Sequence, residues 1–357
     1  MKKFASLLTF SVLTVFALVV LFPSCTGPDG PMGPAGQNGI DGTDGTDGVD
    51  ANSWCISCHT LDNKTTINTQ FAMSSHGQGN YAGYAGGRSG CAKCHSYQGA
   101  METMMTGKDT TAANIPIPVA FKCDMCHGFH MSLDEGDFPD YALRDTEIVS
   151  VISTGHTTTI DLAGSSNACV QCHQTRRTTS PFNGDSVNIS SSHWGGHHGP
   201  QGQILDGTGA FEPTGSMTIE NSAHTATVGC STCHMAKNAD RTDVGGHTWV
   251  MKADDGYENL VGCTACHADA TSFDLNGSQT AIHALLEELH GLLVEHGLYS
   301  EEGLHDGGHP VTGMYPANKA GAVYNYILFE EDRSAGVHNP KYTKAVLTNT
   351  IEMVESW

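Results

Sequence analysis

The sequence has few of the residues that usually build a protein core or bind nucleic acid. Aromatic residues make up 7% of its 357 residues, and charged residues make up 15%. Lysine and arginine together number 17 against 38 aspartates and glutamates, for a formal net charge of −21. A surface this acidic repels nucleic acid and offers no basic stripe to bind it, so we exclude nucleic-acid binding. The low aromatic content, beside 42 glycines, indicates that something other than side chains fills part of the interior.

Cysteines outside a repeated motif are also nearly absent. Twelve of the 13 cysteines form six Cys-x-x-Cys pairs, each followed directly by a histidine, and Cys25 is left over. Neither a disulfide scaffold nor a cytosolic enzyme requires this spacing. In chain order, the first to sixth motifs are Cys55, Cys58 and His59; Cys91, Cys94 and His95; Cys123, Cys126 and His127; Cys169, Cys172 and His173; Cys230, Cys233 and His234; and Cys263, Cys266 and His267.

Cys-x-x-Cys-His is the motif to which haem c is attached covalently. The two thiols form thioethers with the porphyrin vinyl groups, and the adjacent histidine ligates the iron from the proximal side. Zinc ribbons and thiol–disulfide sites also use Cys-x-x-Cys pairs, but neither requires a histidine after the second cysteine. Six histidines after six pairs therefore favour six covalently bound haem c groups, with His59, His95, His127, His173, His234 and His267 as proximal ligands.

Fourteen further histidines are available as second, distal ligands to the six irons. A second histidine or a methionine on each iron is typical of low-spin electron carriers, and the histidines suffice without methionine. One ligand is expected from the cluster of His193, His197 and His198, and His198 is preferred. Ranked by position along the chain, the predicted distal ligands are His76, His130, His156, His198, His224 and His247.

Two longer helices are predicted after the last motif. Isoleucine and leucine recur with helical spacing over residues 279–297. Asn339 as N-cap and Pro340 at the first helical position predict a second helix, which ends at about Glu355. His338, just before it, is a lower-ranked ligand or haem neighbour. The other late histidines are expected in solvent or at haem edges, and they are His283, His290, His296, His305 and His309.

Residues 1–24 are interpreted as a secretory signal peptide. Lys2 and Lys3 precede an apolar run that ends before Pro23, as in exported proteins. Cleavage would leave Cys25 as the first residue, ready for lipid attachment. An uncleaved membrane anchor and plain secretion are the alternatives. All three export the chain, and lipidation predicts a location at the outer membrane or cell surface, on its periplasmic or extracellular face.

A glycine-rich spacer and one domain are predicted after the signal peptide. Residues 25–51 contain Cys25 and Gly-x-y triplets like those of collagen. We interpret them as an extended acidic stalk, with a trimerising collagen stem as the alternative. Residues 52–357 are predicted to form one domain, mainly α with extensive loops and little β-structure. Its haem motifs occupy residues 55–267, and residues 268–357 form a helical end without haem.

Beyond the haem motifs, residues 192–202, 229–236, 245–248 and 337–342 resemble segments of multihaem c-type cytochromes. The similar group includes cytochrome c554, hydroxylamine oxidoreductase and pentahaem nitrite reductase. This resemblance implies a chain of packed haems wrapped by short helices and loops, with longer helices at the C-terminal end. The Cys-x-x-Cys-Lys motif of the catalytic haem in pentahaem nitrite reductase is absent from this sequence.

These observations together predict an electron-transfer conduit with six low-spin haems, tethered at the outer cell surface for anaerobic or extracellular respiration. Its expected partners are other redox proteins, in particular multihaem cytochromes. No catalytic residue is assigned. One alternative is a reductase of small nitrogen or sulfur oxyanions that has one open haem. Another is a subunit of an extracellular cytochrome filament.

Overall fold

The computed structural model describes residues 60–128, 142–162, 165–177 and 180–357. The chain divides into two units, Met1–Ala51 and Asn52–Trp357, and only the second contains described residues. The predicted signal peptide, Cys25 and the glycine-rich spacer therefore lie outside the described residues.

The first motif also lies outside the described residues, with its cysteines Cys55 and Cys58 and its histidine His59. So does the predicted distal ligand His130. Haem attachment at Cys55 and Cys58, and ligation by His59 and His130, therefore stay predictions from the sequence.

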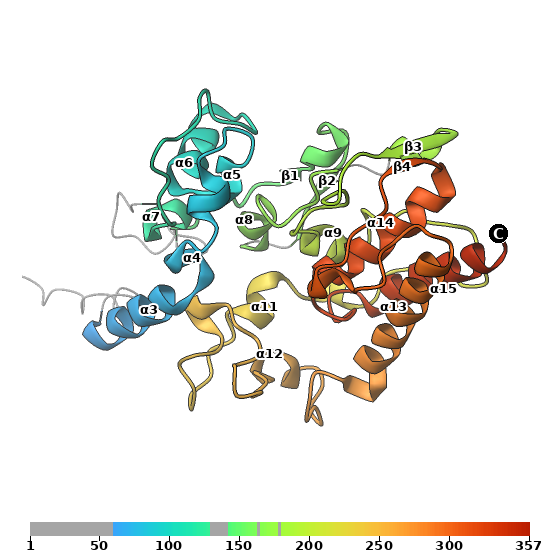
Figure 1. Ribbon diagram of the computed structural model, residues 1–357. Coiled ribbons are helices and arrows are strands. Elements are labelled where there is room, and N and C mark those ends of the chain that lie inside the picture. Colours follow the sequence, from blue (N-terminus) through green and yellow to red (C-terminus); the bar gives the residue numbers. More distant parts are fainter. Residues whose placement is uncertain (1–59, 129–141, 163–164, 178–179) are drawn as a thin grey trace, which may run out of the picture. The chain divides into compact units, whose positions relative to one another are not determined.

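Short helices joined by long loops make up the part of the chain that contains the motifs (Figure 1). Each of the five described motifs overlaps a helix of four or five residues, and the first cysteine of each motif lies in this helix or directly before it. The α-helices of this part are α3 (Leu61–Met73), α4 (Ser75–Gln78), α5 (Ala92–His95), α6 (Tyr97–Thr106), α7 (Cys123–Cys126), α8 (Ser166–Val170), α9 (Gln201–Asp206), α10 (His224–Thr227), α11 (Cys230–His234) and α12 (Val261–Thr264). The structure also describes the π-helix η1 (Ala82–Gly86) and the 3₁₀ turns η4 (Ile152–Thr154), η5 (Ser180–Asn183), η6 (Gly246–Thr248), η7 (Leu275–Gly277) and η8 (Leu304–Asp306).

Two short antiparallel sheets account for the strands that the structure describes. Strand β1 (Val149–Ser150) pairs with β2 (Thr159–Ile160), and β3 (Ser186–Ile189) pairs with β4 (Gly313–Pro316). The second pair joins the middle of the chain to its C-terminal part, with Ser186 opposite Pro316. The prediction of a mainly helical fold with extensive loops and little β-structure is confirmed.

Three longer helices pack together at the C-terminal end: α13 (Ser278–Glu295), α14 (Ala317–Asp332) and α15 (Pro340–Glu355) (Figure 1). The two predicted helices correspond to α13 and α15, and the Asn339 side chain caps α15 by accepting from the Tyr342 N–H at 3.4 Å. The sequence pattern did not predict α14. Twelve of its 16 residues are buried, so it lacks the polar face that gives a surface helix its period.

The apolar core lies mainly among these three helices. Ile282, Leu289, Tyr324 and Leu347 are at most 2% exposed and belong to one large cluster. Between residues 60 and 148, by contrast, the buried apolar residues that the structure describes are four alanines, Ala82, Ala85, Ala92 and Ala100. This region carries the second and third motifs, so its low apolar content agrees with cofactors filling part of the interior. Within the described ranges, no helix is both long and apolar enough to cross a bilayer.

Candidate haem-binding sites

Each motif histidine in the described residues lies opposite a second histidine from a distant part of the chain. The ring centres are 6.1 to 6.3 Å apart in all five pairs. The pairs, with the motif histidine first, are His95 with His197, His127 with His247, His173 with His76, His234 with His338 and His267 with His224.

This separation fits a metal ion between the two rings. Metal–imidazole bonds of about 2 Å, with roughly 1 Å from each ring centre to its nitrogen, place two ligating rings about 6 Å apart. Aromatic rings in direct contact take separations from about 4.5 to 7 Å, so a single pair would carry little weight. Two features of the set point to metal ligation. The separations of the ring centres fall in a narrow range, and every pair contains one motif histidine.

The motif cysteines also fit covalent attachment of haem. All ten that the structure describes are free thiols, and none of these ten is in a disulfide. Two free thiols one helical turn from a paired histidine form the donor set of haem c. Haem c, when bound, supplies an iron that changes its charge by one electron.

The described motif cysteines differ in how far they are exposed. Cys123 and Cys266 are exposed, whereas the other eight are partly buried. Cys266 lies beyond the end of α12, in a turn where its N–H donates to the Cys263 carbonyl at 3.1 Å. The N–H of His267 donates to the same carbonyl at 2.8 Å, so the turn keeps the three residues of the sixth motif together. The haem predicted at Cys266 would therefore be attached near the protein surface rather than in an enclosed interior.

Hydrogen bonds donated by Nδ1–H orient four of the paired rings. The Nδ1 atom of His173 is 3.1 Å from Gln201 Oε1. In His224 and His234 it lies 2.8 Å and 2.9 Å from the backbone carbonyls of Val337 and Trp249. In His338 it lies 2.7 Å from Asp332 Oδ1. Such contacts fix the tautomer and leave Nε2 free to ligate a metal.

Burial keeps several of the distal rings neutral. It lowers the pKa of His76, His197 and His247 to about 4, and a neighbouring histidine adds to the effect in each case. A histidine ligates metal through an unprotonated nitrogen. At pH 7 these three rings are therefore in the form that ligation requires.

Three of the six predicted distal ligands, His76, His224 and His247, lie opposite motif histidines. The structure differs from the prediction at His198. It places the neighbouring His197 opposite His95, whereas the His198 side chain is 69% exposed and its Nδ1 is 2.6 Å from Glu331 Oε1. The physical reason is a turn in which His197 adopts a φ of 75°, so consecutive histidines take different directions.

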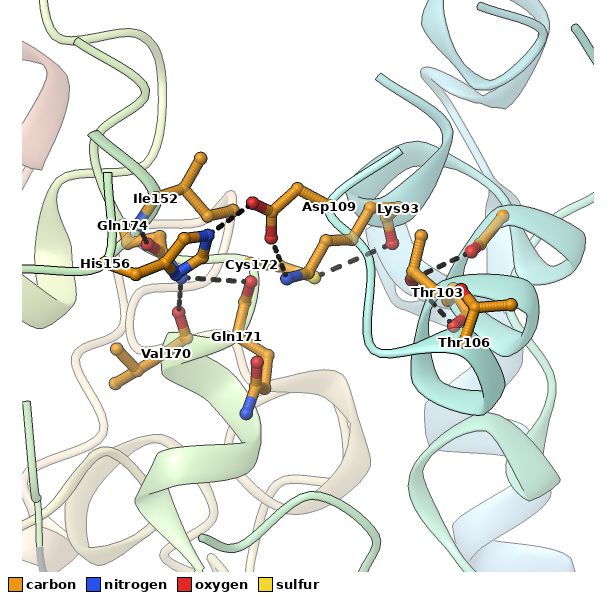
Figure 2. Close-up of polar contacts among 12 residues, drawn as sticks. Lys93, Thr103, Thr106, Asp109, Ile152, His156, Val170, Gln171, Cys172 and Gln174 are labelled. Atoms are coloured by element: carbon orange, nitrogen blue, oxygen red, sulfur yellow. Dashed lines mark hydrogen bonds and ion pairs between the residues drawn. The ribbon is translucent and has the colours of Figure 1, made fainter. Parts of the chain in front are cut away.

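The structure also differs from the prediction at His156. Its Nε2 atom, which a ligand would use, is 2.6 Å from Asp109 Oδ2, and its side chain is 47% exposed (Figure 2). The other Asp109 oxygen is 3.3 Å from Lys93 Nζ. The left-handed backbone of His156, with a φ of 65°, turns the ring toward these charged groups. Within the described residues, the ring forms no pair with a motif histidine.

The sequence prediction ranks His338 below the other distal candidates, and the structure places its ring opposite that of His234. It did not single out Trp249 at all. The Trp249 ring contacts two predicted distal ligands, His76 and His247, with centre separations of 4.9 Å and 5.5 Å. Its carbonyl accepts the hydrogen bond from His234. Trp249 therefore touches histidines from the pairs of the third, fourth and fifth motifs, from a strained left-handed backbone with a φ of 55°.

Cysteines of different motifs contact one another. The thiol of Cys94 contacts that of Cys172, and the thiol of Cys169 contacts that of Cys230. Beside the first of these contacts, Cys172 Sγ lies 3.9 Å from the Lys93 carbonyl (Figure 2). The second, fourth and fifth motifs thus form a contiguous series.

The sixth motif continues this series beyond the fifth. A Cβ atom added to Gly262, beside Cys263, would lie 2.8 Å from the Cα atom of Cys233. Real side chains do not approach a backbone this closely, so the absence of a side chain at Gly262 allows α12 to pack against α11.

The fold is of a kind found in cytochromes. A solved structure, that of the outer cell wall cytochrome OcwA, is similar with a TM-score of 0.50 at 18% sequence identity. The similarity covers 81% of this chain and 50% of that one, so the chain spans about half the length of OcwA. No family model and no curated protein matches this sequence.

Proposed function

We propose that this chain is an electron-transfer protein that holds haem c at its six Cys-x-x-Cys-His motifs, each iron ligated by two histidines. The observation that carries the proposal is the set of five histidine pairs with ring centres 6.1 to 6.3 Å apart. A pair of imidazoles occupies both axial positions of an iron and leaves no position open for a substrate. This favours electron transfer over reduction of a bound oxyanion.

The contacts between motifs support transfer from one site to the next. The second, fourth and fifth motifs touch through their thiols, and Gly262 brings the sixth against the fifth. Cofactors attached at adjoining cysteines lie within the short distances that electron transfer requires, while the protein sets their ligands and surroundings. The chain's part in the process is to hold these sites in series.

A place at the outer cell surface is the second part of the proposal. It is supported by the signal-like N-terminus, by Cys25 as a lipid acceptor and by the likeness in fold to an outer cell wall cytochrome. The Gly-x-y spacer would hold the domain away from the anchored end, and other cytochromes would exchange electrons with it. The net charge of −21 favours partners with a basic docking surface.

Carbon monoxide binding to the reduced holoprotein tests the proposal. We expect no fast binding, because an iron with two histidines must lose one before it accepts carbon monoxide. Fast binding by one haem equivalent would contradict the proposal and favour the reductase alternative. Electron microscopy of the same sample distinguishes single particles from the filaments of the third alternative.

A further inference from the structure

The last residue of α14, Asp332, is a buried carboxylate that faces a predicted haem ligand. Its side chain is 1% exposed, and Oδ1 is 2.7 Å from Nδ1 of His338. The other oxygen, Oδ2, accepts a short hydrogen bond from the Ser334 hydroxyl. Ser334 Oγ in turn accepts from the His338 backbone N–H at 3.3 Å. Asp332, Ser334 and His338 therefore form one hydrogen-bonded network.

The contact is different in kind from those at the other oriented rings. His234, the partner of His338 in the fifth pair, donates to a backbone carbonyl, and so does His224. His173 contacts the Oε1 atom of Gln201. These three acceptors are neutral, whereas Asp332 carries a full negative charge when ionised. Among the four Nδ1 hydrogen bonds described for paired histidines, the fifth motif thus has the one charged acceptor.

A charged acceptor affects the reduction potential of the iron as well as the imidazole ring. A carboxylate that accepts the Nδ1 proton makes the other ring nitrogen a stronger donor to metal. A stronger donor stabilises the ferric over the ferrous state. A buried negative charge acts in the same direction, because it favours the higher positive charge on the iron at low dielectric. Both effects lower the reduction potential.

We propose that Asp332 acts through His338 as a positioning residue that sets the haem of the fifth motif at a lower potential than those of the fourth and sixth. This inference rests on the proposed function. The fifth motif lies between its two neighbours, in contact with the fourth through Cys169 and Cys230 and with the sixth through Gly262. An electron that crosses between these neighbours therefore meets an energetically uphill step at the fifth site, which Asp332 controls.

The test is a redox titration of the Asp332→Asn holoprotein, followed by electron paramagnetic resonance. Asparagine keeps the size and the acceptor oxygen but removes the charge, so the potential of one haem should rise while the others stay unchanged. Glu331→Gln is the matched control, because Glu331 is the neighbouring buried carboxylate and contacts His198, which is not paired with a motif histidine. It should leave the potential of the fifth haem unchanged.

A second variant should shift the reduction potential of the fifth haem in the opposite direction. It also keeps the inference testable if Asp332→Asn fails to fold. Ser334→Ala removes the hydroxyl that shares the carboxylate, so Asp332 accepts more strongly from His338 and the same potential should fall. Unchanged potentials in either variant, with the fifth haem attached and low-spin, would overturn this inference alone. A fifth haem that is absent or high-spin in the unmodified protein would overturn the proposed function instead.

Discussion

At the residue scale, the choice of ligand depends on local backbone turns. His197 and His198 are adjacent, yet the first lies opposite His95 and the second contacts Glu331. The left-handed conformation of His197 places the two rings in different surroundings. Burial lowers the pKa of His197 to about 4, whereas the hydrogen bond to Glu331 raises the pKa of His198. His197 is thus suited to ligate a metal as a neutral ring, whereas His198 is suited to a charged contact with Glu331.

Substituting these two histidines separately tests the pairing. His197→Ala removes the ring opposite His95, so one haem should become high-spin and bind carbon monoxide quickly. His198→Ala is the matched control and should keep every haem low-spin, because it removes the contact with Glu331 and a ring contact with His197 but leaves the ring opposite His95 in place. The absorption spectrum before and after carbon monoxide measures both outcomes. A high-spin haem in the His198 variant alone would show that the assignment of the two residues is reversed.

The sequence assigns the proximal histidines directly, but it only ranks the candidates for the distal side. A motif histidine is fixed by its covalent spacing from two cysteines, which is a local property of the chain. A distal histidine is fixed by tertiary contact, so its position in sequence gives only a rank. The structure pairs neither His198 nor His156 with a described motif histidine, and the left-handed residues at these turns, His197 and His156, have no sequence signature beyond a neighbouring glycine. His338, which its position in sequence ranks lower, lies opposite His234 directly before the helix cap Asn339.

At the element scale, the start of α15 supports two sites at once. The Val337 carbonyl accepts from His224, the partner of the sixth motif histidine, and the next residue, His338, lies opposite His234. Asn339, which is fully buried, caps α15 and also accepts from the Ser222 N–H at 2.9 Å. One short segment therefore positions ligands for both the fifth and the sixth motif.

The packing of α12 against α11 provides a test at this scale. Gly262→Ala would place a methyl group 2.8 Å from the Cα atom of Cys233, so the backbone must move. We expect a loss of about 1–3 kcal/mol in the free energy of unfolding, as for other overpacked sites, and altered spectra for the haems of the fifth and sixth motifs. Chemical denaturation and electron paramagnetic resonance measure the two effects.

The control is an exposed helical glycine with free space around it. A Cβ atom added to Gly291 in α13 has no atom within 4 Å, so Gly291→Ala should raise stability by up to about 1 kcal/mol. The haem spectra should not change. A Gly262→Ala protein with unaltered stability and spectra would show that α11 and α12 do not depend on this close approach.

Helices with a strong sequence period were predictable, and helices without one were not. The leucine repeat of α13 and the Asn339–Pro340 start of α15 each carry a local signal. In α14, buried residues cover nearly the whole circumference, and they include the polar Asn325, Glu331 and Asp332. Its sequence alone does not distinguish it from a buried strand.

At the scale of the whole molecule, two regions of unequal composition share one domain. The C-terminal helices hold a conventional apolar core, whereas the buried apolar residues described between 60 and 148 are alanines. Under the proposed function, the region that contains the motifs gains stability from bound haem, which adds apolar surface and binds the folded state alone. The haem-binding region is therefore expected to depend on haem for folding more strongly than the helical end.

The central claim is that every haem has two histidine ligands, and electron paramagnetic resonance of the oxidised protein tests it most directly. Three described pairs have crossed rings, at 78°, 84° and 81°, and two have rings at 36° and 34°. Crossed imidazoles give strongly anisotropic low-spin signals, whereas rings closer to parallel give rhombic ones. We predict both low-spin classes, with an integrated intensity that accounts for all six haems. A high-spin ferric signal that integrates to one haem or more would contradict the account.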